Sequence, residues 1–135
     1  MTSIIHITTS FFPVYIGGLA IISHISGWFF HVNSLVRFSY WLYLLMALVT
    51  TFTCAFGGAS IRAVESAPGI DASVVKTHAW TGMGVFLLTL LLAYLSIRAI
   101  RKKEGKYNPD KILLILSIGF LILFTITTLA AFRIR

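Results

Sequence analysis

Four histidines are the residues of this chain best suited to chemistry in a membrane. His6 and His78 each stand just before a long apolar run, His24 lies inside one, and His31 ends one. A neutral imidazole can ligate a metal ion or haem iron, exchange a proton, or form a hydrogen bond. The four acidic residues all lie outside the apolar runs, so we expect no proton path through carboxylates. Any site in the membrane region should therefore be built on histidine.

Four apolar runs position these histidines. They cover roughly residues 11–30, 36–56, 79–97 and 112–132, and each would be about 30 Å long as a helix, the thickness of a hydrocarbon core. The chain is 58% hydrophobic and only 11% charged, whereas a soluble domain carries about 25% charged residues. The sequence predicts one all-α domain over residues 1–135, an integral membrane four-helix bundle. Its helices are expected at about 11–30, 36–56, 72–98 and 112–132, the third capped by Asp71.

The basic residues predict the orientation of the bundle. Of the 11 Lys and Arg residues, Arg37 and six residues between 98 and 111 fall on one face, giving seven. The opposite face has four, Arg62, Lys76, Arg133 and Arg135. The positive-inside rule places the loop near residues 98–111 in the cytoplasm and both termini on the outer side. These cations cluster at the ends of the apolar runs, where basic residues commonly flank membrane spans. The net charge of +7 is therefore explained by the membrane, and we expect no nucleic-acid partner.

Depth along the helices limits which histidines can cooperate. His24 is 13 residues into the first helix, about 20 Å from its outer end, whereas His78 lies at the outer end of the third. His24 and His31 are seven residues, or about 10 Å, apart on one helix, an awkward spacing for two ligands of one haem. His6 precedes the first helix by five residues and is therefore at the depth of His78. His6 and His78 are the pair best placed to share a site.

Small residues accompany His24 along the first helix. Spacings of three and four place the following residues on one face: Gly17, Ala20, His24, Gly27 and His31. A similar small face on the second helix contains Ala47, Thr50, Thr51, Cys54 and Gly58. Such faces allow close helix packing, which we favour, or the approach of a flat cofactor. His24 is then either a functional group or a neutral imidazole hydrogen-bonded to a Ser or Thr.

The opening of the chain resembles a known family. His6 to Pro13 reads H-I-T-T-S-F-F-P, and an uncharacterised bacterial four-span membrane family begins its first helix with H-P-x-x-V-H-F-P. In this register His6 matches the first family histidine and Phe12-Pro13 the F-P pair, while Phe11 replaces the second histidine. Further matches are short and extend through the third helix: Gly57-Gly58, Glu65 and His78.

The resemblance implies a role in membrane electron transfer, because some members of that family are joined to c-type cytochrome domains. It implies a multi-pass protein of the bacterial cytoplasmic membrane, in which the positive-inside count places both termini on the periplasmic side. Two histidines, His6 and His78, remain as expected ligands of a b-type haem near the outer face, which four-helix bundles commonly hold. The replacement at Phe11 removes a third ligand, so the site suits haem better than zinc or copper.

Two other functions stay open. The chain carries no Ser/His/Asp set, paired carboxylates or phosphate loop, so we expect no catalytic activity of its own. It is either a cofactor-free accessory subunit that packs against larger subunits of a membrane complex, or a quinone- or pigment-binding subunit that uses His24.

Overall fold

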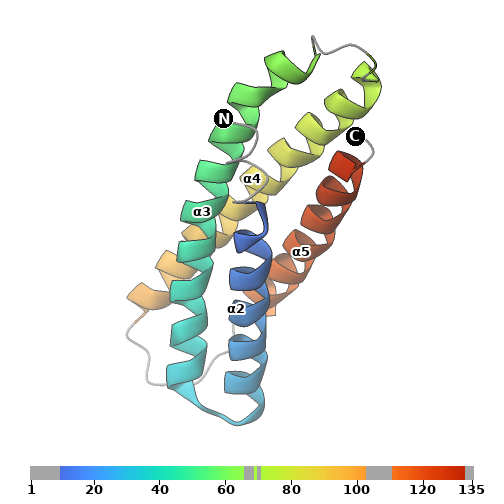
Figure 1. Cartoon of the computed structure of the whole chain (residues 1–135). Coiled ribbons are helices and arrows are strands. Elements are labelled where there is room, and N and C mark those ends of the chain that lie inside the picture. Colours follow the sequence, from blue (N-terminus) through green and yellow to red (C-terminus); the bar gives the residue numbers. More distant parts are fainter. Residues whose placement is uncertain (1–9, 66–68, 70, 103–110, 133–135) are drawn as a thin grey trace.

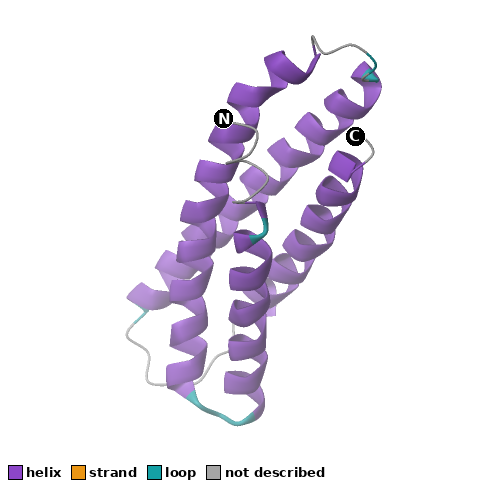
Figure 2. Cartoon of the chain, in the orientation of Figure 1, coloured by secondary structure: helices purple, strands orange, loops and turns teal. Residues whose placement is uncertain are grey.

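The structure is a computed structural model of the whole chain, and it describes residues 10–65, 69, 71–102 and 111–132. Four helices make up nearly all of this part, and no strand occurs in it (Figure 2). They are α2 (Phe12–Phe29), α3 (Asn33–Glu65), α4 (Ala72–Arg101) and α5 (Lys111–Phe132). Each contains a segment long and apolar enough to cross a membrane. The predicted four-helix membrane bundle is therefore confirmed, whereas the side on which the termini lie stays a prediction.

The helices pack in the order of the sequence. α2 packs on α3, α3 on α4 and α4 on α5, and α5 closes the bundle against α2 (Figure 1). Large apolar side chains such as Ile22, Leu48 and Leu87 face outward, more than half exposed. An apolar exterior of this kind is suited to lipid, since the backbone groups are already satisfied within each helix.

The helices differ greatly in length. α3 has 33 residues and α4 has 30, against 18 in α2 and 22 in α5. At 1.5 Å per residue, α3 is about 50 Å long and α2 about 27 Å. Figure 1 shows α3 and α4 continuing beyond the start of α2 toward the loop that joins them. α2 therefore does not reach this α3–α4 end of the bundle.

Local signals explain several helix ends. Pro13 sits in the first turn of α2, where a missing N–H costs little. The Asp71 carboxylate accepts a hydrogen bond from the Ser73 N–H at 2.8 Å, which confirms the predicted cap of α4. Hydrogen bonds from the side chain and backbone of Ser73 hold the pKa of Asp71 below its usual range. The cap therefore keeps its charged acceptor at neutral pH.

The turn from α2 to α3 is built on an unusual residue. His31 has a φ of 59°, in the left-handed region that favours glycine. The His31 N–H donates to the Trp28 carbonyl and the Val32 N–H donates to the Gly27 carbonyl, the two bonds of a Schellman motif. His31 is exposed and follows the end of α2. The spacing pattern placed His31 in line with His24, but α2 ends before it, and its side chain lies exposed in the turn at the end of the bundle.

Candidate functional site

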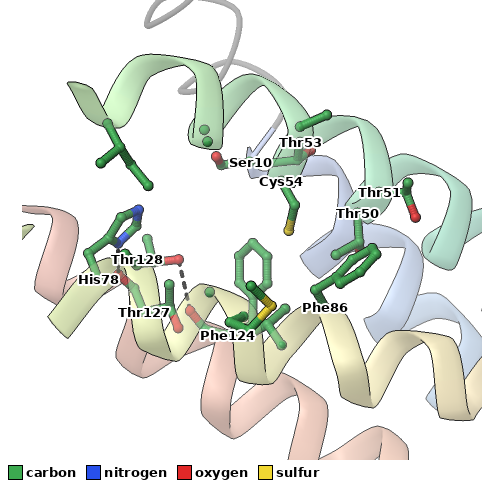
Figure 3. A pocket seen from close by; sticks show the side chains of 18 of the residues that line it. Ser10, Thr50, Thr51, Thr53, Cys54, His78, Phe86, Phe124, Thr127 and Thr128 are labelled. Atoms are coloured by element: carbon green, nitrogen blue, oxygen red, sulfur yellow. Dashed lines mark hydrogen bonds between the residues drawn. The ribbon is translucent and has the colours of Figure 1, made fainter. Parts of the chain in front are cut away.

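A pocket of about 470 Å³ opens at the α3–α4 end of the bundle. Its walls come from α3, α4 and α5, and Ser10 and Phe11, which precede α2, complete its lining. Figure 3 shows His78 at one end of the pocket and Thr50 with Phe86 at the other. Ligand sites of proteins usually have volumes of about 300–1,000 Å³ and mostly apolar walls. The pocket has the size of a site for a small cofactor.

Two glycines on facing helices widen the pocket. Gly58 of α3 and Gly82 of α4 both line it, and a Cβ atom added at either would meet nothing within 4 Å. The face of small residues predicted on the second helix, now α3, therefore has two parts with different surroundings. Ala47 is buried against the neighbouring helices, whereas Thr50, Thr51, Cys54 and Gly58 line the pocket. The expectation of close helix packing holds for Thr50, which is also buried, but not for Thr51, Cys54 and Gly58, because α2 begins too late to cover these three.

His78 is held in place by α5. Its Nδ1 lies 3.1 Å from the carbonyl oxygen of Thr127, and the ring is half-buried (Figure 3). A carbonyl can only accept a hydrogen bond, so Nδ1 carries the proton and Nε2 carries the ring's lone pair. Histidines that ligate metals commonly donate one ring N–H to a backbone carbonyl and bind the metal through the other nitrogen. The contact fixes the tautomer that ligation through Nε2 needs.

The other polar side chains of the pocket leave its walls largely apolar. The hydroxyls of Thr51, Thr53, Thr127 and Thr128 each donate to a carbonyl of their own helix four residues earlier. Cys54 is half-buried, and its sulfur points into the space between α3 and α4 (Figure 3). It is the single cysteine of the chain. It therefore offers a chemical probe of the pocket that needs no engineering.

His24 belongs to a different region. It is 1% exposed, its ring meets Tyr40 edge-on at 5.7 Å, and its Nδ1 lies 3.4 Å from the Tyr43 hydroxyl. The Tyr43 hydroxyl donates to Ser117 Oγ at 3.2 Å, and Ser117 donates to the Leu114 carbonyl at 2.8 Å. Since that carbonyl only accepts, the chain of donors runs from the His24 Nδ1–H through Tyr43 to Ser117. Three helices are joined by this chain of hydrogen bonds.

The structure separates the histidines as the depth argument expected. His78 lines the pocket, whereas His24 does not. His6 lies outside the described residues, and Ser10, four positions later in the sequence, lines the pocket with His78. Within the described part of the chain, no three His, Cys, Asp or Glu side chains gather closely enough to hold a metal ion. The described ligand of a candidate haem site is therefore a single imidazole.

Several residues of the site were not predicted from the sequence. Thr127 holds His78 through its backbone, and backbone carbonyls leave no signal in a sequence. Gly82 and Phe124 contribute to the pocket walls from α4 and α5. The one available signal was Gly82, four residues after His78 and thus on the same face of the helix.

No family model, curated protein or solved structure matches the chain.

Proposed function

We propose that the chain is a small, non-catalytic membrane subunit of electron transfer that binds a b-type haem in the pocket between α3, α4 and α5. The observation that carries the proposal is the position of His78. Its ring lines an apolar pocket of about 470 Å³ and is held by the Thr127 carbonyl in the tautomer suited to ligation. Bundles of membrane helices commonly hold haem between facing helices in this way.

The residues present fit one side of a haem. His78 would hold the group through its imidazole, and the open space beside Gly58 and Gly82 would give it room between α3 and α4. The bound group would supply reversible one-electron transfer. The chain's own part is to orient the ligand through Thr127 and to surround the ring with apolar side chains such as Phe86 and Phe124.

The second residue that would hold the haem in this proposal is His6, the partner that the sequence predicts. Support comes from Ser10, which follows His6 closely in the sequence and lines the same pocket. The positive-inside count favours an orientation with this pocket on the periplasmic face of a bacterial cytoplasmic membrane. In such a position the subunit would exchange electrons with a partner at that face.

The first test is the absorption spectrum of the purified protein. We expect a Soret band and a reducible b-type spectrum, lost in His78→Ala and kept in His31→Ala, because His31 is exposed in the turn between α2 and α3. Haem content is measured by the pyridine assay and helicity by circular dichroism. A colourless wild-type protein without haem, purified from cells supplied with haem, would contradict the proposal.

A second pair of variants tests the pocket without touching the ligand. Gly82→Leu should abolish haem binding and leave the helices intact, because the new side chain enters open space. Gly18→Leu is the matched control: a Cβ there also meets nothing within 4 Å, but Gly18 does not line the pocket. Haem should also slow the labelling of Cys54 by an apolar maleimide. Equal haem content in Gly82→Leu and Gly18→Leu would exclude this pocket as the haem site.

Two alternatives make different predictions. A cofactor-free accessory subunit would co-purify with larger membrane subunits and would show no absorption change in any of these variants. In that case the His78 contact with Thr127 would serve only to join α4 to α5. A quinone or pigment on His24 would survive His78→Ala and Gly82→Leu, because His24 lies outside the pocket.

A further inference from the structure

The end of α4 farthest from the haem pocket carries a second depression, and its lining is basic. Three exposed cations, Arg98, Arg101 and Lys102, line it together with Tyr94 and Ile97. The depression is open to the surroundings and has a volume of about 480 Å³. A depression lined by cations at one edge and by apolar groups at the other has the polarity of a site for an amphipathic anion.

The spacing of these residues matches the polarity gradient of a membrane surface. Tyr94, Arg98 and Arg101 are separated by four and three residues, which places them on one face of the helix. Arg98 lies about 6 Å and Arg101 about 10 Å beyond Tyr94 along the axis. Tyrosine is enriched where the hydrocarbon meets the headgroups, and arginine is common just beyond it. The tyrosine ring therefore marks the hydrocarbon edge, and the guanidinium groups reach the level of lipid phosphates.

The end of a helix explains only part of this arrangement. Both arginines lie in the last turn of α4, where the helix dipole favours cations. The dipole does not require that the cations share one depression with an exposed tyrosine. In the part of the chain that the structure describes, no carboxylate forms an ion pair with any of the three.

We propose that this depression binds the phosphate of an anionic phospholipid. The two guanidinium groups hold phosphate oxygens through paired N–H donors, the geometry in which arginine surpasses lysine. Tyr94 and Ile97 contact the glycerol and the first carbons of the acyl chains, and Lys102 adds attraction for the negative headgroup. The lipid site does not depend on haem, because it lies at the other end of α4 from His78.

The test measures lipid retention by the intact protein in mild detergent. After delipidation, the protein is mixed with equal amounts of phosphatidylglycerol and phosphatidylcholine, and native mass spectrometry counts the lipids that remain bound. We expect phosphatidylglycerol to be retained preferentially. Arg98→Gln and Arg101→Gln should each weaken its retention about fivefold, the effect of one basic residue near a lipid surface. Arg101→Lys should fall between wild type and Arg101→Gln, because it keeps the charge and loses the paired donors.

The matched control is Lys111→Gln, which removes an exposed cation from the same end of the bundle without altering the depression. Retention of phosphatidylglycerol should be unchanged in this variant. An equal loss in Lys111→Gln and Arg101→Gln would overturn the proposal in favour of diffuse charge attraction. Displacement of the lipid by inorganic phosphate alone would also overturn it, because the site would then serve a free phosphate.

Discussion

Two pairs of glycines, Gly17 with Gly27 in one half of the bundle and Gly58 with Gly82 in the other, have opposite surroundings. In the packed half, around Tyr43, Met46 and Phe120, a Cβ added at Gly17 would lie 2.9 Å from the sulfur of Met46. At Gly27 it would lie 2.7 Å from Cγ2 and 2.8 Å from the backbone nitrogen of Val36. These glycines are required for close helix contact.

In the pocket half, around the cavity lined by His78, the glycines make room for something else. A Cβ at Gly58 or at Gly82 would meet no atom within 4 Å. The same residue type thus lets two helices touch in one half and leaves them apart in the other. A small residue in a membrane helix therefore predicts that something can come close to the helix. It does not predict whether this is a neighbouring helix or a bound group.

The largest test of this contrast compares Gly27→Ala with Gly58→Ala. We expect Gly27→Ala to lower the free energy of unfolding by about 3 kcal/mol, the upper part of the usual range for overpacking, because backbone atoms of Val36 cannot move aside easily. Gly58→Ala should be neutral or raise it by up to about 1 kcal/mol through helix propensity. Unfolding in mixed micelles, followed by circular dichroism, measures both. Similar losses in the two variants would remove the distinction between the halves.

A smaller effect is expected at the hydrogen-bonded centre of the packed half. Tyr43→Phe removes the hydroxyl that joins His24 to Ser117. We expect a loss of about 1–2 kcal/mol, near the upper end for hydrogen bonds between membrane helices. Tyr15→Phe is the control, because Tyr15 is 73% exposed. If both variants unfold alike, the bonds through Tyr43 contribute little to the packing.

The smallest effect concerns a hydroxyl at the border between the halves. Thr50 is 1% exposed, and its Oγ1 has no hydrogen-bond partner among the described residues. All other described threonines donate to the carbonyl four residues earlier: Thr51, Thr53, Thr77, Thr81, Thr89, Thr125, Thr127 and Thr128. Thr50→Val should therefore stabilise the protein by about 1 kcal/mol, since it removes a buried polar group without a partner.

Thr89→Val is the matched control for Thr50→Val. Thr89 is also fully buried, but its hydroxyl donates to the Val85 carbonyl at 2.7 Å. We expect this variant to be neutral or slightly destabilising in the same unfolding measurement. Stabilisation of equal size in both variants would mean that greater hydrophobicity alone produces the effect.

The sequence predicts the fold well because the membrane simplifies the problem. Apolar runs of about 20 residues must be helices in lipid, and α2, α4 and α5 begin and end within three residues of the predicted bounds. The predicted inward face of the first helix is confirmed at Gly17, Ala20, His24 and Gly27, which are all buried. For His24, the structure shows the Tyr43 hydroxyl as a hydrogen-bond partner, and this hydroxyl donates in turn to Ser117.

The parts that the sequence did not predict depend on non-local geometry. Hydropathy falls after residue 56, yet α3 continues to Glu65 because a helix need not end where lipid does. The left-handed residue after α2 was not predicted either, because His31 takes a position at which glycine or asparagine is usual. The pocket results from the mismatch between a short α2 and long α3 and α4. The lengths of the apolar runs alone do not predict this mismatch, because it depends on where each helix ends relative to its neighbours.

The unequal helices also set the shape of the surrounding bilayer. A hydrocarbon core is about 30 Å thick, so a straight α2 of about 27 Å slightly underspans it, while α4, at about 45 Å, overspans it. Short spans draw the lipid surfaces together, and long spans tilt or thicken the layer. One side of this protein should therefore border thinned lipid and the other side lipid of full or greater thickness. Such a protein would have preferred neighbours: partners whose own short helices match the thinned side would relieve the deformation by lying next to α2.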